Sequence, residues 1–114
     1  MNILQVIQSK LKAPKGQRNN FGNYSYRSAE DILTAVKPLL AEVGAALVIS
    51  DSIECYEGRV YVVAQAALVD ADNKLIADST GYAREAAAKK GRDDAQITGS
   101  ASSYALKYAL NGLF

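Results

Sequence analysis

Histidine and tryptophan are absent from this chain of 114 residues, which has a single cysteine and two prolines. Without histidine, the chain lacks the Ser-His and Cys-His pairs that activate nucleophiles, and the imidazole ligands common at zinc sites. The lone Cys55 excludes an intrachain disulfide, and its place on the apolar side of a predicted strand favours a small core residue. We therefore predict no catalytic residue, no metal site and no cofactor.

Long apolar runs are also missing, since no stretch approaches the roughly 18 to 20 residues of a membrane span. The first 12 residues lack the charged start, long apolar middle and cleavage site of a signal peptide. These absences predict a cytoplasmic protein without membrane association. The length and the apolar content of 49% are ordinary for one soluble domain, which we expect to span residues 1–114.

Charge is segregated along the chain, although the net charge is only +1. Residues 1–27 carry five basic side chains and no acidic one, and residues 86–114 carry four basic against two acidic. Residues 28–85 carry four basic against ten acidic. If the two ends fold onto one face, they form a cationic surface that could hold phosphates. The alternative is that the loops simply solvate their lysines.

Two helical segments are predicted before any strand. Apolar residues recur at helical spacing over residues 2–12. A second helix is predicted to begin after Ser28, which suits an N-cap, and to end at Gly44, which suits the terminating position. Pro38 lies inside this second pattern and removes one backbone donor, so we expect a kink or break near residues 34–37.

Three segments of alternating apolar residues predict an antiparallel meander, with tight turns at Glu57-Gly58 and at Asp72-Asn73. They span residues 45–56, 59–70 and 74–85. A basic link follows, and the final helix is expected to begin at Asp93 and Asp94. The order of two helices, three strands and a helix predicts an α+β fold with the last helix packed on the sheet.

The segment PKGQRNNFGNYSYR, residues 14–27, interleaves aromatic and basic residues. Aromatic faces stack on unpaired bases of any identity, while lysine and arginine follow the backbone. The segment is therefore a candidate nucleic-acid contact. The alternative is that its rings pack the loop onto the sheet, with the hydroxyls reaching water.

The last helix has one narrow polar stripe, which includes Ser103 and Lys107, and is otherwise apolar or small. A helix that is apolar nearly all round is contacted on several sides, which suggests the sheet and a second copy of the protein. Ala101 and Ala105 are expected to pack densely on the strands. Tyr104 lies beside the polar stripe and is the better candidate for facing a ligand. Tyr108 is expected in the core or at a subunit interface.

Two blocks resemble the ERF (essential recombination function) family of phage single-strand annealing proteins. They are NFGNYSYRSAEDILTAVKPLL, residues 20–40, and DAQITGSASSYALKYALNGLF, residues 94–114. The resemblance implies a β-β-β-α annealing core that binds single-stranded DNA and anneals complementary strands in phage homologous recombination without ATP. It also implies assembly into a homo-oligomeric ring or filament.

Family members usually continue into a variable tail, which is thought to contact other proteins such as a single-strand-binding protein. Because this chain stops at Phe114, we expect that tail to be missing. The family often has a second basic residue where this chain has Leu106, which weakens the expected contact from the last helix. The candidate DNA-binding residues are Lys15, Arg18, Tyr24, Tyr26, Arg27, Arg84, Lys89, Lys90, Arg92, Tyr104 and Lys107. The candidate oligomer-interface residues are Ile97, Ala101, Leu106, Tyr108 and Leu110.

Three other functions are weighed against annealing. Glu85, Asp93 and Asp94 flank the basic link and could serve a carboxylate-dependent, metal-dependent nuclease acting on single strands. The apolar last helix could instead dock a partner in a self-assembling module that meets nucleic acid only incidentally. Double-stranded RNA binding also fits this order of elements, but that class usually has a lysine cluster at the start of its last helix, where this chain has two aspartates.

Overall fold

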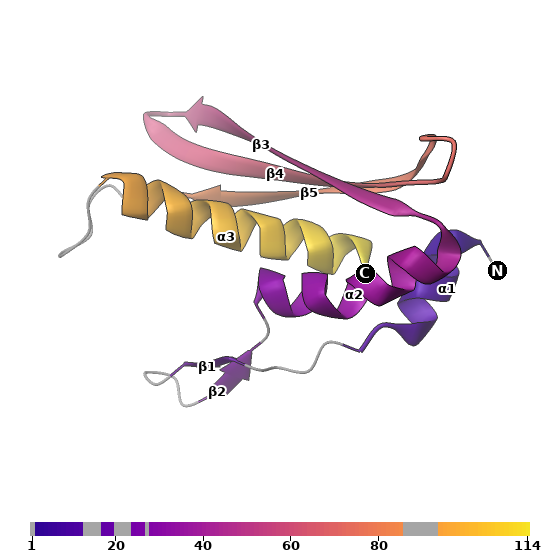
Figure 1. Ribbon diagram of the computed structural model, residues 1–114. Helices are drawn as coiled ribbons and strands as arrows, with labels where there is room; N and C mark the ends of the chain where they lie inside the picture. Colours follow the sequence, from indigo (N-terminus) through magenta and orange to yellow (C-terminus); the bar gives the residue numbers. More distant parts are fainter. Residues whose placement is uncertain (1, 13–16, 20–23, 27, 86–93) are drawn as a thin grey trace.

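The computed structural model describes residues 2–12, 17–19, 24–26, 28–85 and 94–114, and its side chains over 2–12, 28–85 and 101–114. A three-stranded sheet forms one layer, and three helices lie against one of its faces (Figure 1). The elements, in chain order, are α1 (Ile3–Lys10), β1 (Gln17–Asn19), β2 (Tyr24–Tyr26), α2 (Ala29–Val43), β3 (Ala46–Tyr56), β4 (Arg59–Val69), β5 (Leu75–Arg84) and α3 (Asp94–Leu113). The predicted α+β class and the order of the main elements are confirmed.

Capping side chains define the two N-terminal helices. The Asn2 side chain accepts a hydrogen bond from the backbone of Gln5 and forms a capping box at the start of α1. Ser28 does the same for α2, as predicted, with Asp31 as its partner. Gly44 ends α2 in the left-handed conformation, with φ of 70°. The break expected before Pro38 is absent, because α2 runs through it from residue 29 to residue 43.

The sheet is an antiparallel meander in the order β3-β4-β5, so β3 and β5 are its edges. Glu57 and Gly58 both have positive φ, 51° and 76°, as a two-residue hairpin turn of matching twist requires. The second turn is held by Asp70, whose carboxylate accepts hydrogen bonds from the backbone of Asp72 and Lys74. Both predicted turns are confirmed.

Helix α3 lies directly on β4 and β5 because small residues meet along its contact line. Ala101, Ala105 and Ala109, at helical spacing, are 0–5% exposed. Opposite them, Gly81 leaves no room for a side chain, since a Cβ there would lie 2.1 Å from the backbone oxygen of Ala105. Ala64 of β4 is also fully buried against this helix layer. The prediction that Ala101 and Ala105 pack densely on the strands is confirmed.

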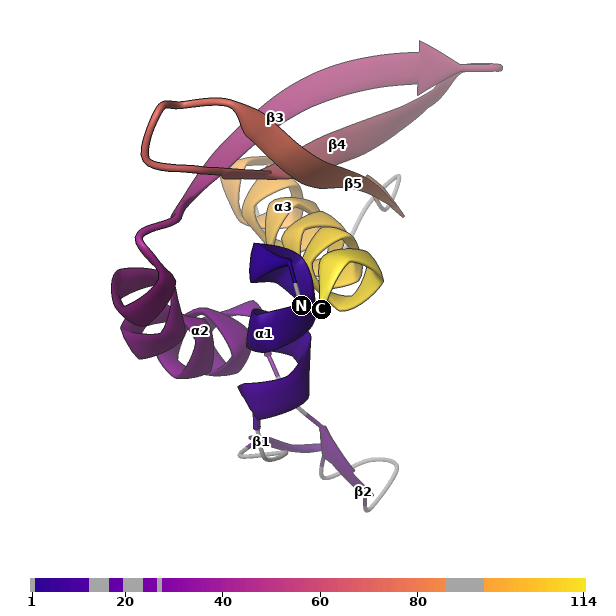
Figure 2. The same ribbon diagram turned by 90° about the vertical axis from the view of Figure 1, so that its right-hand side faces the viewer.

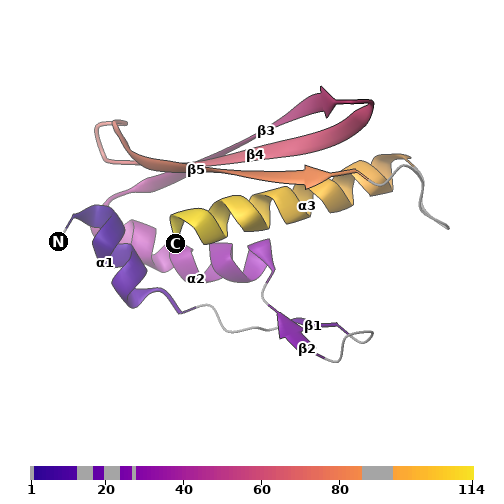
Figure 3. The same cartoon turned by 180° about the vertical axis from the view of Figure 1, so that it is seen from behind.

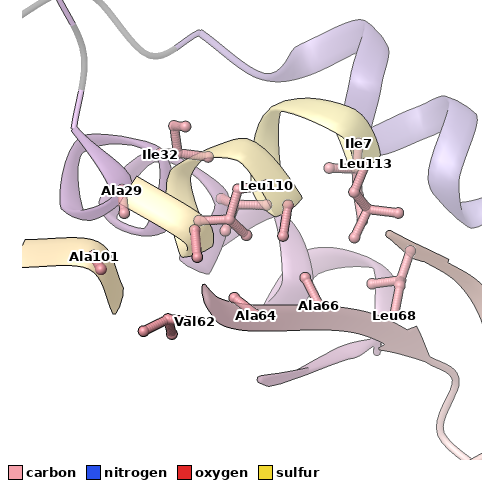
Figure 4. Close-up of a cluster of buried hydrophobic side chains, with 13 residues drawn as sticks. Ile7, Ala29, Ile32, Val62, Ala64, Ala66, Leu68, Ala101, Leu110 and Leu113 are labelled. Carbon is pink, nitrogen blue, oxygen red and sulfur yellow. The ribbon is translucent and has the colours of Figure 1, made fainter. Parts of the chain in front are cut away.

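A single core joins the layers (Figure 4). Inward side chains of β4, such as Leu68, point at α3, and Leu110 of α3 lies between them and Ile32 of α2 (Figure 4). Ile7 of α1 closes the end of this core near Leu113. Helix α3 is thus sandwiched between the sheet on one side and α1 and α2 on the other (Figure 2).

The last residues of β3 are exposed in the part of the chain that the structure describes, which corrects one prediction. Cys55 was expected in the core but is exposed, and Ile53 on the same face is 62% exposed. The reason is that α3 packs mainly on β4 and β5. Strand β3 packs on the helices near its start, at Leu47, and the Asp51 carboxylate in its middle accepts a hydrogen bond from the hydroxyl of Ser102 on α3. The segment expected to be a loop contains a short hairpin, in which β1 pairs antiparallel with β2.

Candidate nucleic-acid interface

A hollow of about 300 Å³ lies between β5, an edge strand of the sheet, and α3. Its lining residues are Tyr82, Ala83, Arg84, Tyr104 and Tyr108. The three tyrosines are 53%, 54% and 51% exposed, so water reaches their aromatic surfaces. Figure 3, which shows the molecule from the opposite side to Figure 1, has β5 running alongside α3. The hollow is therefore an open, largely aromatic site.

The position of the two helical tyrosines follows from the packing of α3. Tyr104 and Tyr108 are four residues apart and so share one side of the helix. Each directly precedes a fully buried alanine, Ala105 or Ala109, that rests against the sheet. A turn of 100° per residue therefore places both tyrosines on the flank of the helix, beside β5 and not beneath it.

The backbone of β5 adds hydrogen-bonding groups to this site. The N–H of Glu85 donates to the carbonyl oxygen of Val60 at 2.8 Å, which makes these residues a hydrogen-bonded pair. Because such pairs alternate along an antiparallel ladder, the N–H and C=O groups of Tyr82 and Arg84 point away from β4, toward the free edge. Two of the three β5 residues that line the hollow, Tyr82 and Arg84, therefore also expose backbone donors and acceptors there.

Arg84 supplies positive charge to the hollow, and its side chain is exposed. A negative charge lies across the sheet on the same face, because register places Glu54, Tyr61 and Arg84 in one row. Two strand spacings, roughly 10 Å in all, separate the Cα atoms of Glu54 and Arg84. A hydrogen bond to Glu54 raises the pKa of Tyr56, and desolvation and the negative charge of Glu54 add to this.

The hollow unites residues that the sequence assigned to different roles. Arg84 and Tyr104, predicted to contact DNA, line it together with Tyr108, which was predicted in the core or at a subunit interface. At 51% exposed, Tyr108 is not a core residue. Lys107, next to Tyr108 in the chain, is half-buried on α3.

Other predicted residues lie elsewhere. Arg18, Tyr24 and Tyr26 belong to the β1–β2 hairpin, which lies beyond the helices, on the side opposite the three-stranded sheet (Figures 1 and 2). Ile97 lies in α3. Lys15, Arg27, Lys89, Lys90 and Arg92 fall outside the described residues.

Two predicted interface residues belong to the chain's own core, which is a correction. Ala101 is 5% exposed and Leu110 is fully buried. Leu106 is half-buried and packs against the same core. The sequence pattern of α3, apolar nearly all round, was attributed partly to a second copy. The helix instead meets the sheet on one side and α1 and α2 on the other, and these contacts account for Ala101 and Leu110.

Tyr82 is the site residue that sequence reasoning missed. Alternation along the third strand already placed Tyr82 and Arg84 on the same side, two residues apart, so the pattern could have paired them. No group of three Asp, Glu, His or Cys side chains able to hold a metal occurs within the described part of the chain. Of the three residues weighed for the nuclease, Asp93 and the side chain of Asp94 lie outside that part. None of the helices described there is both long and apolar enough to cross a membrane.

Comparison with known proteins identifies the family. The ERF superfamily matches residues 1–114. The chain is 54% identical over 111 residues to the "Essential recombination function protein" of Salmonella phage P22, an alignment that covers 97% of this chain and 52% of the relative. The chain thus spans about half the length of the curated relative it matches. No solved structure matches it significantly. The family match over residues 1–114 of the chain, together with this relative, shows that the chain belongs to the ERF superfamily.

Proposed function

We propose that this domain binds single-stranded DNA and anneals complementary strands in homologous recombination, as an oligomer and without ATP. The observation that carries the proposal is the hollow, where three accessible tyrosines meet an arginine at an open sheet edge. Stacking on aromatic side chains with cationic neighbours is how proteins hold single strands without reading sequence. The printed name of the relative from phage P22, a recombination function, supports the same conclusion.

The mechanism needs binding and no covalent step. Basic side chains neutralise the phosphates of one strand, and most of its bases stay accessible to a complement. Stacking contributes about 1 to 3 kcal/mol per base, so one protomer with few contacts binds weakly. Several protomers on one strand multiply that affinity, because each later contact is intramolecular. Assembly is therefore part of the proposed mechanism.

The exposed apolar side chains of β3 are the best candidate for the subunit contact. Val48, Ile49, Ile53 and Tyr56 are 39–62% exposed, and all four lie on this one edge strand. An apolar edge strand left uncovered promotes association with another chain. The predicted contributions of Ile97 and Leu106 remain part of the proposal, whereas Tyr108 lines the hollow and Ala101 and Leu110 belong to the core.

An annealing assay tests the central proposal. Two complementary labelled oligonucleotides, mixed with the protein and without ATP, are expected to pair faster than they do alone. Binding to either strand is expected to weaken with salt, by about 0.7 in log-log slope for each phosphate contact. Shortened strands appearing with Mg²⁺ would support the nuclease instead. Unchanged pairing rates together with salt-independent binding would refute annealing.

A matched pair of variants tests the β3 contact. Ile53→Lys places a charge on β3 at a position 62% exposed, and Leu75→Lys does the same on β5 at a position 60% exposed. Light scattering of the wild type is expected to give a mass well above the 12.2 kDa of one chain. Ile53→Lys is expected to lower that mass, and Leu75→Lys to leave it unchanged. Equal masses for all three proteins would show that this part of β3 does not form the subunit contact.

A further inference from the structure

The hollow has a volume on the scale of a site for a single flat ring. Its volume of about 300 Å³ is at the lower end of the range for small-molecule pockets, about 300–1,000 Å³. Tyr104 and Tyr108 line the hollow from α3, and Tyr82, Ala83 and Arg84 line it from the edge of β5. Because Gly81 faces α3, alternation turns Ala83 toward the helix and turns Tyr82 and Arg84 toward the opposite face of the sheet. Three half-exposed phenol rings offer stacking surface, and the volume is on the scale of one base.

The free edge of β5 supplies what a flat heterocycle needs at its rim. Tyr82 and Arg84 direct backbone N–H and C=O groups toward that edge, and no described residue pairs with them there. The rim of a nucleobase carries the same mixture of donors and acceptors. A phosphate fits less well, because Arg84 is the only cationic side chain among the described residues that line the hollow.

We propose that this hollow takes one unpaired nucleobase of the bound strand, stacked on tyrosine and hydrogen-bonded to the edge of β5. Arg84 then contacts the adjoining phosphate. The inference rests on the proposed binding of single-stranded DNA and refines it, because one base per protomer turns into the protein while its neighbours face outward. That base pairs with a complement only after it leaves the hollow.

Replacing tyrosine by leucine or by phenylalanine distinguishes stacking on an aromatic ring from contact with any apolar side chain of similar size. Tyr82→Leu and Tyr104→Leu remove the aromatic face at exposed positions, whereas Tyr82→Phe and Tyr104→Phe keep it. Binding is measured with two oligonucleotides of equal length, one of thymidylates and one of abasic deoxyribose phosphates. Circular dichroism confirms folding of each variant, and light scattering gives its assembled mass.

The expected result is a loss of affinity only for the strand that carries bases. Each leucine variant should bind the thymidylate strand about 5- to 150-fold more weakly than wild type, and the abasic strand equally well. The phenylalanine variants should stay close to wild type on both strands. A thymidylate strand with one 2-aminopurine should lose fluorescence on binding wild type and lose less on binding the leucine variants.

Three results would overturn the inference. Equal weakening on both strands would place the tyrosines on the sugar-phosphate backbone. Unchanged binding by both leucine variants would place the bases elsewhere, while the proposed binding of single-stranded DNA would still stand. A changed assembled mass with unaltered dependence on bases would mean that a strand of a second copy occupies the β5 edge. Failure of wild type to bind either oligonucleotide would refute the proposed function itself.

Discussion

Gly81→Ala is expected to destabilise this domain more than its single added methyl group suggests. The new Cβ would lie 2.1 Å from the carbonyl oxygen of Ala105 and 2.5 Å from the backbone nitrogen of Ala109. Both neighbours are backbone atoms of α3, so no side-chain rotation relieves the overlap. The helix must move away from β5, and the buried contacts of Ala105 and Ala109 loosen with it.

The expected loss is about 3 kcal/mol, at the upper end of the cost of overpacking a core. A gain of roughly 0.4 to 1 kcal/mol from restricting the unfolded chain offsets a small part of it. At about 4 °C or more for each kcal/mol in a domain of this size, the melting temperature should fall by roughly 10 °C or more. Urea unfolding and thermal melting, followed by circular dichroism at one protein concentration, measure both quantities.

Gly112→Ala, on the α3 side of the same contact between α3 and β5, is the matched control. Its Cβ would lie 2.5 Å from the hydroxyl oxygen of Ser79, which rotation of that side chain can move, and 3.6 Å from the Ser79 Cβ, an ordinary contact. Alanine also has the better helix propensity, by up to about 1 kcal/mol. The control should therefore be neutral or slightly stabilising. If the free energy of unfolding of Gly81→Ala lay within about 0.5 kcal/mol of the wild-type value, α3 could not lie as close to β5 as the structure has it.

Two further changes test local features of the fold. Pro38→Ala restores a backbone donor toward the carbonyl of Thr34 inside α2. It should raise the free energy of unfolding, measured in urea, by about 1 to 3 kcal/mol. An unchanged urea midpoint would show that Pro38 does not destabilise α2. Asp70→Ala removes the acceptor for the backbone of Asp72 and Lys74 and should cost about 1 to 2 kcal/mol, whereas Asp70→Asn, which keeps an acceptor, should cost less. Equal losses for the two Asp70 variants would show that the side-chain acceptor is not what holds the turn.

The main elements could be predicted from local patterns because local chemistry sets their limits. Ser28 caps α2 through its own backbone neighbours, and Gly44 ends it through a conformation that glycine adopts without strain. The hairpin at Glu57 and Gly58 follows equally from two adjacent residues with positive φ. The exposure of Cys55 could not be predicted in this way, because alternation identifies a face of a strand but not how far a helix extends across it.

The candidate site was predicted only in part, for a similar reason. Arg84 and Tyr104 were identified by residue type, yet they are 20 positions apart and meet only through the packing of α3 on β5. Tyr82 was missed because strand alternation gives its side but not its neighbours across the edge. Leu110 was assigned to an interface because sequence shows that a helix is apolar all round, not which chain covers it.

Stability and the hollow depend on the same contact. Gly81 and the buried alanines bring α3 against β5, and the residue before each of Ala105 and Ala109 is a tyrosine carried to the rim of the hollow. Any change that lifts the helix from the strand must therefore separate Tyr104 and Tyr108 from Tyr82. Gly81→Ala should accordingly weaken both folding and the binding of bases, whereas Tyr82→Leu should weaken only the binding. The small residues of α3 thus serve the site by setting the distance between the helical tyrosines and the edge of β5.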